Sequence, residues 1–317
     1  MNTITQTRHL KMLKTAFGHT IASLLEDKDI IEVMLNPDGK LWAESLTKGK
    51  FFTEVIIDAQ QAQNIINLVA ANHQAIANAE YPEIACDLPE SYARFQGWLP
   101  PVTTAPCFTI RKRAISVFTL EDYVAAKSIT LHYATLLKQA IKDKKNILIA
   151  GGTGSGKTTL ANALLHELKG SNERIIVLED LPELQVTADD CVKLVTTGTK
   201  NMRDLVKGTL RMRPDRIIIG EVRDGAALEL LKSWNTGHPG GICTIHANSP
   251  EATLVRLEDL IQEAVAIVPQ RLIQETINLI IFIRRDCNGK YIVETVHTYE
   301  KAANGGFCLQ LQALGMH

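Results

Sequence analysis

Residues 151–158 read Gly-Gly-Thr-Gly-Ser-Gly-Lys-Thr, and this octapeptide decides the fold of the chain. It follows an apolar run over residues 146–150 and precedes a helix-like stretch over residues 158–169. A strand, a glycine-rich turn and a helix in this order form the context of a phosphate-binding P-loop. The glycines let backbone N–H groups turn toward a polyphosphate, and the helix N-terminus adds a positive dipole end. The stretch predicts a nucleoside triphosphate site, and a glycine-rich turn without a ligand is the alternative.

Two side chains of the octapeptide have specific chemical roles in such a loop. We expect Lys157 to reach the β- and γ-phosphates and Thr158 to offer its hydroxyl to Mg²⁺. The expected cofactors are therefore Mg²⁺ and the substrate ATP, although no motif separates ATP from GTP. The full expected nucleotide-binding set is Gly151, Gly152, Thr153, Gly154, Ser155, Gly156, Lys157, Thr158 and Thr159.

Composition narrows the class of protein. The 317 residues suffice for two domains, with 45% hydrophobic and 22% charged residues, as in an ordinary globular protein. Nucleic-acid binding that is not sequence-specific needs clustered cations, so a net charge of -1 without a basic block disfavours DNA as a direct partner, and we expect no direct sequence-specific nucleic-acid partner. The six cysteines form no C-x-x-C pair, so we expect reduced thiols and a cytoplasmic location.

A membrane span is the alternative reading of residues 59–79, which carry no charge. The stretch is interrupted by many Gln and Asn residues, whereas a span needs about 20 predominantly apolar residues. We therefore expect an amphipathic surface helix over 59–79, with any membrane contact peripheral.

The chain changes character near residue 118. Before it, turn signals and alternating runs at 30–35, 41–44, 92–99 and 108–113 predict a small mixed α/β domain with antiparallel strands. After residue 130, short β-rich runs alternate with helical segments, which predicts a mostly parallel sheet. The expected organisation is an N-terminal α/β domain (1–118), a linker (119–130) and a RecA-like P-loop domain (131–317). The β-rich runs of this last domain are 146–150, 174–178, 192–196, 216–220, 241–245 and 279–283.

Polar residues follow several of these strands. Glu179 and Asp180 follow the second run, Glu221 follows the fourth, and His246 and Asn248 follow the fifth. Ligands of open parallel sheets lie beyond the carboxyl ends of the strands, so these groups should converge on the P-loop. Hydrolysis of Mg²⁺·NTP needs a metal-positioning acid and a group that orients water. Glu179 and Glu221 are the candidates, and which does which stays open.

Two further groups near these strands are ambiguous. Asp215 precedes its strand, roughly 20 Å from Glu221 along an extended chain, so we expect a structural role. His246 lies where it could sense the γ-phosphate, and His238 shares its glycine-rich run. A lone histidine after a strand is more often a packing or surface residue, and the two readings of this pair are about equal.

Four ordered stretches now form a recognisable set: GGTGSGKT at 151–158, IIVLEDLPEL at 175–184, LRMRPDRIIIGEVRD at 210–224 and TGHPGGICTIHANS at 236–249. They resemble the Walker A, Asp box, Walker B and His box of the secretion, or traffic, ATPase superfamily. The N-terminal stretches DIIEVMLNPDGKLW, RFQGWLPPV and FTIRKR extend the likeness over about residues 20–285 and favour the branch that serves type IV secretion and conjugation.

This resemblance implies functional properties that the residues alone do not. It implies a homohexameric ring that binds ATP between its RecA-like and N-terminal domains. Hydrolysis would power pilus assembly or substrate transfer beside inner-membrane components, in the cytoplasm or peripherally on the membrane. By position, Lys157 and Thr158 hold phosphate and Mg²⁺, whereas the catalytic groups are Glu179, Glu221, His238, His246 and two N-terminal arginines, Arg94 and Arg111. Thr158, Glu179 and Glu221 form the metal set, and Arg203 and Arg213 are weaker candidates for contacting a neighbour.

Some alternatives stay open. For Arg94 and Arg111, a solvated strand face is slightly the better reading until the resemblance is taken into account. A RecA-like nucleic-acid motor would require a basic channel with stacking aromatics, yet only 5% of the residues are aromatic. A type II secretion or type IV pilus-type motor is a second alternative, although the paired-cysteine module common in type II relatives is absent. A non-hydrolysing binding module is disfavoured by the intact Lys157, Thr158, Glu179 and Glu221.

Overall fold

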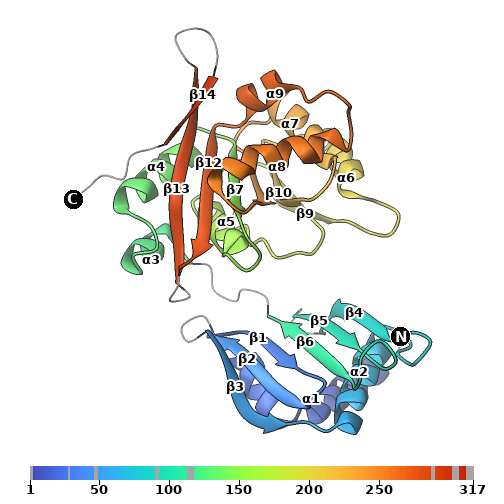
Figure 1. Ribbon diagram of the computed structural model, residues 1–317. Coiled ribbons are helices and arrows are strands. Elements are labelled where there is room, and N and C mark those ends of the chain that lie inside the picture. The colour runs from blue at the N-terminus through green and yellow to red at the C-terminus, as the bar shows by residue number, and fades with distance from the viewer. Residues whose placement is uncertain are drawn as a thin grey trace. The chain divides into compact units, whose positions relative to one another are not determined.

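The computed structural model describes residues 3–27, 29–45, 49–89, 93–112, 118–286, 290–301 and 307–311. The chain divides into two compact units, Met1–Ser116 and Val117–His317, each with its own sheet and core (Figure 1). The first contains, in chain order, α1 (Thr3–Glu26), β1 (Ile30–Leu35), β2 (Lys40–Ser45), β3 (Gly49–Ile56), α2 (Ala59–Asn72), β4 (Glu83–Asp87), β5 (Arg94–Trp98) and β6 (Cys107–Arg111).

The second unit is longer and alternates helices with strands. It contains α3 (Leu120–Ala125), α4 (Leu131–Lys142), β7 (Ile147–Gly151), α5 (Lys157–His166), β8 (Ile175–Glu179), β9 (Cys191–Val195), α6 (Met202–Thr209), β10 (Arg216–Val222), α7 (Ala226–Asn235), β11 (Ile242–His246), α8 (Pro250–Gln262), α9 (Gln270–Thr276), β12 (Leu279–Arg285), β13 (Tyr291–Lys301) and β14 (Phe307–Leu311).

The sheet of the first unit is antiparallel, in the order β3-β2-β1-β6-β5-β4. Alternate residues of its strands, such as Val33, Phe95 and Ile110, are fully buried in one core with residues of α1 and α2. Because side chains alternate across a strand, the residues between them lie on the opposite face of the sheet. That face carries the polar residues discussed below.

The two helices of the first unit correct the sequence predictions. α1 was not predicted; it places Leu13, Phe17 and Ile21 in the core at a spacing of four, and Gly18 kinks it with φ 66°. The helix predicted over 59–79 is α2, which ends at Asn72 because Gln74 adopts a φ of 56°. In the described part of the chain, no helix combines the length and apolarity that crossing a membrane requires.

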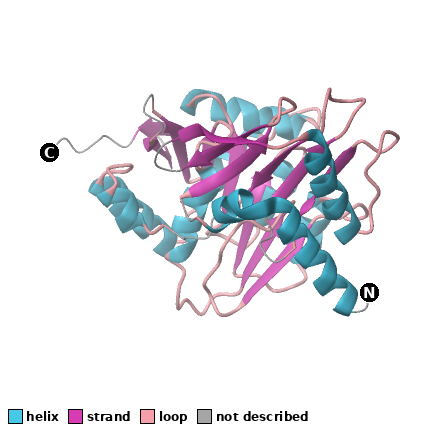
Figure 2. Ribbon diagram, turned by 90° about the horizontal axis from the view of Figure 1, so that it is seen from below, coloured by secondary structure: helices cyan, strands magenta, loops and turns pink. Residues whose placement is uncertain are grey.

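The sheet of the second unit has the order β14-β13-β12-β7-β11-β10-β8-β9. The six strands from β12 to β9 are parallel, and at one edge β13 pairs antiparallel with β12 and β14 pairs antiparallel with β13. Each of the six predicted β-rich runs coincides with one of the parallel strands to within about two residues at each end. Figure 2 shows the strands of this sheet with helices on either side.

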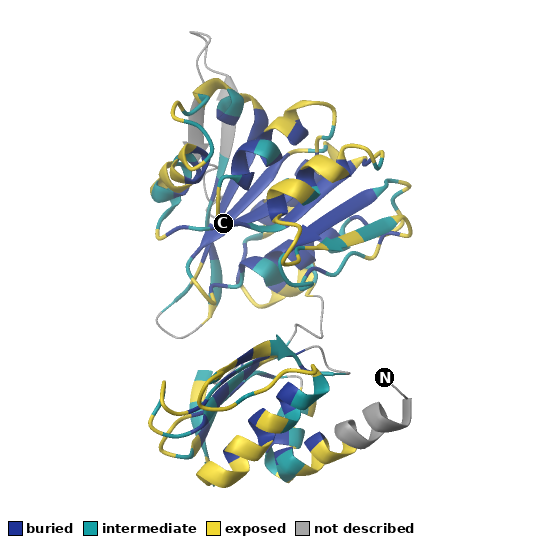
Figure 3. Cartoon of the chain, turned by 90° about the vertical axis from the view of Figure 1, so that its right-hand side faces the viewer, coloured by how far each residue is buried: buried dark blue, intermediate teal, exposed yellow. Residues whose placement is uncertain are grey.

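Helices cover both faces of this sheet and make a three-layer α/β unit. In β7, Ile147 and Ile149 face a core shared with α3, α4 and α5, whereas Leu148 and Ala150 face a core shared with α6, α7, α8 and α9. The central strands are therefore buried on both faces, as Figure 3 shows in dark blue. The predicted α/β fold with a P-loop domain is confirmed.

Residues 119–130, predicted to be a linker, contain a helix. Thr119 caps α3 in a reciprocal capping box with Asp122, and Leu120 and Tyr123 are buried in the core of the second unit. These residues therefore pack as part of the P-loop unit.

Candidate functional site

The P-loop lies between β7 and α5, at the carboxyl end of the parallel sheet. Gly156 caps α5 with a φ of 92°, and a Cβ there would lie 2.8 Å from the ring of Tyr291. A Cβ on Gly151 would collide with the carbonyl oxygen of Ile283 and with Ser155. Glycine is therefore required at both positions: at Gly156 by the positive φ and by crowding, and at Gly151 by crowding alone.

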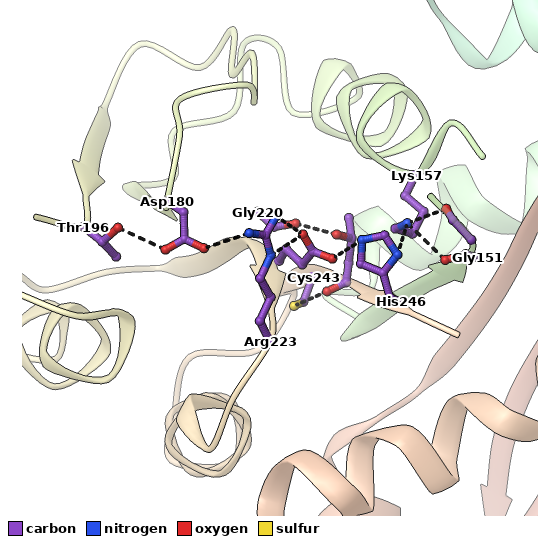
Figure 4. Close-up of polar contacts among 11 residues, drawn as sticks. Gly151, Lys157, Asp180, Thr196, Gly220, Arg223, Cys243 and His246 are labelled. Carbon is purple, nitrogen blue, oxygen red and sulfur yellow. Dashed lines mark hydrogen bonds and ion pairs between the residues drawn. The ribbon is translucent and has the colours of Figure 1, made fainter. Parts of the chain in front are cut away.

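Lys157 is the buried cation of this loop, with 7% of its surface exposed. Its Nζ donates to the carbonyl oxygens of Gly151 at 3.0 Å and Gly152 at 2.8 Å, and it lies 3.3 Å from Nδ1 of His246 (Figure 4). The ammonium group is thus held at the mouth of the loop by acceptors on two neighbouring strands, β7 and β11.

His246 ends β11 and connects Lys157 to Glu221. Its Nε2 lies 2.7 Å from Oε1 of Glu221. Burial lowers the pKa of His246, as do the charges of Lys157 and Arg223, and Glu221 opposes them only in part. A neutral imidazole that accepts from Lys157 at Nδ1 carries its proton on Nε2, on the side of Glu221. The histidine can therefore pass a change at the phosphate-binding lysine to the carboxylate.

Beyond Glu221 the contacts continue across the sheet. Arg223 donates from Nε to Oε2 of Glu221 at 2.8 Å, and its Nη2 lies 2.6 Å from the same oxygen. Its Nη1 lies 4.0 Å from Oδ2 of Asp180, and Oδ1 of Asp180 accepts from Thr196 Oγ1 at 3.0 Å. We call the series Thr196, Asp180, Arg223, Glu221, His246, Lys157 the polar relay, which Figure 4 follows across the strand ends.

Arg223 and Thr196 are the members of the relay that the sequence predictions missed, and Arg223 is the one that contacts Glu221. A signal for it exists, because residues 221 and 223 are two apart at the end of a strand and therefore face the same side. Asp180 was noted as a strand-end acid but was not assigned a role.

Glu179 lies apart from the relay. Its Oε1 accepts from the N–H groups of Glu183 at 2.8 Å and Leu184 at 2.7 Å. Its Oε2 is buried and has no hydrogen-bond partner among the described residues. Burial raises the pKa of Glu179, against the lowering effect of those two N–H groups. A buried carboxylate oxygen without a partner is uncommon in proteins, and a bound ion, water or ligand would give it one.

The oxygen donors available here fit Mg²⁺. Mg²⁺ keeps several waters and is usually bound through one or two carboxylates and the substrate phosphates, not by an all-protein cage. Thr158, half-buried in the first turn of α5, and the unpaired Oε2 of Glu179 supply such donors. Within the described ranges, no cluster of three or more His, Cys, Asp or Glu residues could hold an ion by itself. That the ion rests on Thr158, Glu179 and Glu221 stays a prediction.

The structure does not bring His238 to the P-loop. His238 precedes β11 and lies at the opposite end of that strand from His246, with Nδ1 3.0 Å from the carbonyl oxygen of Pro214. Asp215 is at the same end, where its Oδ2 accepts from the N–H of Arg174 at 2.7 Å, in agreement with a structural role. A catalytic role for His238 in this site has no geometric support within one chain.

Arg203 and Arg213, the two arginines predicted to contact a neighbouring subunit, have partly or fully exposed side chains. Arg203 pairs with Glu229, with 3.1 Å between Nη2 and Oε1, so it joins α6 to α7. Arg213 is exposed and has a φ of 55°. A neighbour-contacting role for either residue stays a prediction.

Arg94 and Arg111 lie in the first unit, directly opposite each other on β5 and β6. Both are exposed, and neither forms a hydrogen bond or ion pair with another described residue. They belong to a line of paired residues that crosses all six strands, which we call the charged row: Lys50, Glu44, Glu32, Arg111, Arg94, Asp87. Burial raises the pKa of Glu32, an effect that the charge of Arg111 opposes.

A cavity of about 710 Å³ opens beside the P-loop, on the side of α8. Its walls come from the P-loop, the first turn of α8, and the ends of β12 and β13. The lining residues are Gly152, Thr153, Ser155, Asn248, Ser249, Pro250, Glu251, Phe282, Arg284, Arg285, Glu294 and Thr295.

Comparison with known proteins identifies relatives of the whole chain. Residues 54–315 match the family model described as "Type II/IV secretion system protein". The chain is similar to the conjugal transfer protein TrbB of Rhizobium radiobacter, with 44% identity, covering 92% of this chain and 90% of that protein. It is also similar to the type IV secretion system protein VirB11 of Bartonella quintana, with 31% identity, covering 77% of this chain and 80% of that protein.

The fold has solved counterparts as well. The X-ray structure of the Legionella pneumophila ATPase DotB superposes with a TM-score of 0.63 at 20% identity, covering 84% of this chain and 76% of DotB. At this level of identity the likeness concerns the fold, and it agrees with an N-terminal unit joined to a P-loop unit.

Proposed function

The chain belongs to the type II/IV secretion system protein family, and on that premise we propose that it is an ATPase whose hydrolysis powers conjugative pilus assembly or substrate transfer through a type IV secretion system. The observation that carries the chemical part of this proposal is the polar relay. It joins the phosphate-binding lysine to a strand-end carboxylate through one histidine.

Lys157 and Glu221 have complementary roles in this proposal. Lys157, which the P-loop carbonyls hold in place, meets the β- and γ-phosphates and neutralises the charge that develops on them. Glu221 is positioned one imidazole away, where a carboxylate orients and polarises the attacking water. His246 lies between Lys157 and Glu221 and responds to a change of charge on either side. Catalysis of this kind is positioning plus electrostatics, which a pre-assembled relay supplies.

The metal set supports the phosphates from the other side. Bound Mg²⁺ would offset the negative charge of the phosphates. Thr158 would offer its hydroxyl, and Glu179 would use its unpaired Oε2 to hold the water shell. The two N–H groups on Oε1 fix the direction of that carboxylate.

The paired arginines of the first unit suit an external anion. Like charges directly opposite each other on a sheet are destabilising, so Arg94 and Arg111 gain when a polyanion binds between them. We propose that they contribute to ATP hydrolysis from the N-terminal domain, which would make turnover depend on domain closure.

The likeness to the relatives supports a proposal for the assembly and the location. We propose a homo-oligomer, a hexameric ring, that works in the cytoplasm beside inner-membrane components of the secretion apparatus. TrbB is described as a conjugal transfer protein and VirB11 as a type IV secretion system protein. These descriptions favour a type IV secretion apparatus over the type II system.

The test of this proposal combines hydrolysis with transfer. In Lys157→Ala, steady-state phosphate release should fall at least about a hundredfold, because the charge on the transferring phosphate is lost. Plasmid transfer should also fail in cells that carry only this variant. Lys232→Ala, which removes an exposed lysine of α7, is the matched control and should behave as the wild type. Undiminished hydrolysis in Lys157→Ala contradicts the enzymatic proposal, and normal transfer without hydrolysis contradicts the proposed use of the energy.

A further inference from the structure

Arg223 holds the strand-end carboxylate from the side opposite the P-loop. Two of its nitrogens, Nε and Nη2, lie 2.8 and 2.6 Å from one oxygen of Glu221, and the other oxygen lies 2.7 Å from His246. The carboxylate is largely buried, with 15% of its side chain exposed, whereas Arg223 is 58% exposed. Glu221 is therefore held between a cation on the solvent side and the histidine on the phosphate side.

The charges explain why such an anchor matters. Lys157 and Glu221 carry opposite charges and are separated by one imidazole ring, with contacts of 3.3 and 2.7 Å on its two sides. A direct ion pair between them would occupy the lysine that phosphate needs and the carboxylate that water needs. A guanidinium on the far oxygen opposes that collapse, because it attracts the carboxylate away from the lysine.

Arg223 is itself held in place. Asp180 lies 4.0 Å from its Nη1 and is anchored by Thr196 at 3.0 Å. Although partial burial disfavours its charged form, Glu221, Asp180 and Glu183 together raise the pKa of Arg223. The guanidinium therefore carries a permanent charge in a defined position between two strand ends.

We propose that Arg223 is a positioning residue for hydrolysis: it fixes Glu221 in the orientation that activates water and prevents Glu221 from pairing with Lys157. The inference rests on the proposed ATPase function and adds a group that acts only through Glu221. Arg223 touches no reacting atom in this account.

The proposal predicts different effects on activity and on stability when Arg223 is replaced. Because the side chain of Arg223 is 58% exposed, solvent screens its pairing with Glu221, and the pair contributes little to stability. Removal of the guanidinium should therefore leave the melting temperature almost unchanged. The loss should fall on kcat, because a misplaced water-activating group affects the transition state more than substrate binding.

The experiment compares Arg223→Ala and Arg223→Lys with the wild type in steady-state hydrolysis, and it measures the affinity for a Mg²⁺-bound non-hydrolysable ATP analogue. We expect Arg223→Ala to lower kcat about tenfold to a hundredfold, with KM and Kd within twofold. Arg223→Lys should recover part of the rate, because it restores charge without the fork. Arg271→Ala, which breaks an exposed arginine–glutamate pair of 2.7 Å on α9, is the matched control and should leave kcat unchanged.

A double-variant cycle shows whether Arg223 acts through Glu221. In a Glu221→Gln background, measured by single-turnover hydrolysis, the further change Arg223→Ala should have no effect. The inference is overturned if Arg223→Ala keeps kcat within twofold, if Kd rises in step with the loss of kcat, or if the two changes add fully. A wild-type protein that does not hydrolyse ATP overturns the proposed function instead, which keeps the two failures distinct.

Discussion

The polar relay of the P-loop unit and the charged row of the N-terminal unit are both lines of polar side chains across a sheet, yet their charges are ordered differently. In the relay, each charged group lies next to a group of opposite charge or is separated from it by a histidine. The charged groups of Asp180, Arg223, Glu221 and Lys157 therefore satisfy one another. In the charged row, two glutamates and then two arginines stand side by side. Each charged member of the relay has a partner within the chain, whereas we propose that the arginine pair receives an external anion.

This difference has a physical consequence. The relay is preorganised, so it needs little rearrangement when charge develops on a phosphate. In our proposal, Arg94 and Arg111, which lie directly opposite each other, would contribute only when the polyanion reaches them. The two arrangements therefore suggest a division of labour, in which one unit performs the chemistry and the other makes it conditional.

Replacing the arginine pair with neutral residues is the strongest test of the difference between the relay and the charged row. Arg111→Gln should lower kcat about a hundredfold, since a guanidinium that stabilises transferring phosphate contributes a factor of 10³–10⁵ in other NTPases. Adding Arg94→Gln should lower it further but less than additively, because both arginines would serve one anion. Steady-state phosphate release at several salt concentrations makes the measurement.

The control for this pair comes from the same row. Lys50→Gln removes an exposed cation that lies over the ring of Trp42, at the other end of the charged row, and should leave kcat unchanged. Rates within twofold of the wild type in Arg111→Gln would mean that the exposed pair is only a solvated strand face.

A smaller effect, on the pH dependence of stability, is expected in the P-loop unit at Glu179. Burial raises the pKa of Glu179 above the ordinary value of 4.5, so the folded state holds a proton that the unfolded state releases as pH rises. The stability of the wild type therefore falls from about pH 4.5 up to the folded-state pKa and is then constant, as far as this group is concerned. Glu179→Gln can still accept the two N–H bonds and avoids the buried charge.

The melting temperatures of the wild type and Glu179→Gln between pH 4.5 and pH 8 measure this effect. We expect the variant to be the more stable of the two, by a margin that grows as pH rises and then levels off. Asp259→Asn removes an exposed carboxylate of α8 and should show no such trend. A margin that shrinks with rising pH would show that the Glu179 carboxylate stabilises the fold.

Much of the P-loop unit could be predicted because its local signals agree with its tertiary structure. The apolar runs at 147–151, 175–179 and 216–222 are strands buried on both faces, so hydrophobicity alone marks them. The P-loop is recognisable from its glycines, of which Gly151 and Gly156 leave no room for a side chain. Strand-end placement then brings Glu221 and His246 beside Lys157, as the sheet order requires.

Other features depended on contacts between distant residues. Among the residues of α1 whose burial the structure describes, Leu13, Phe17 and Ile21 are buried in the core, and Gly18 interrupts the helical pattern between them. His238 shares a motif with His246, but β11 separates them by its full length. Oε1 of Glu179 is held by the N–H groups of Glu183 and Leu184, a contact that no spacing rule reveals.

The grip of the glycine-lined loop on a triphosphate is tested most directly by isothermal titration calorimetry with a Mg²⁺-bound, non-hydrolysable ATP analogue. We expect saturable binding to the wild type and at least about tenfold weaker binding to Lys157→Ala, because a buried charge-assisted contact is lost. A wild-type protein that shows no binding heat, confirmed by equilibrium dialysis, would contradict the account at its foundation.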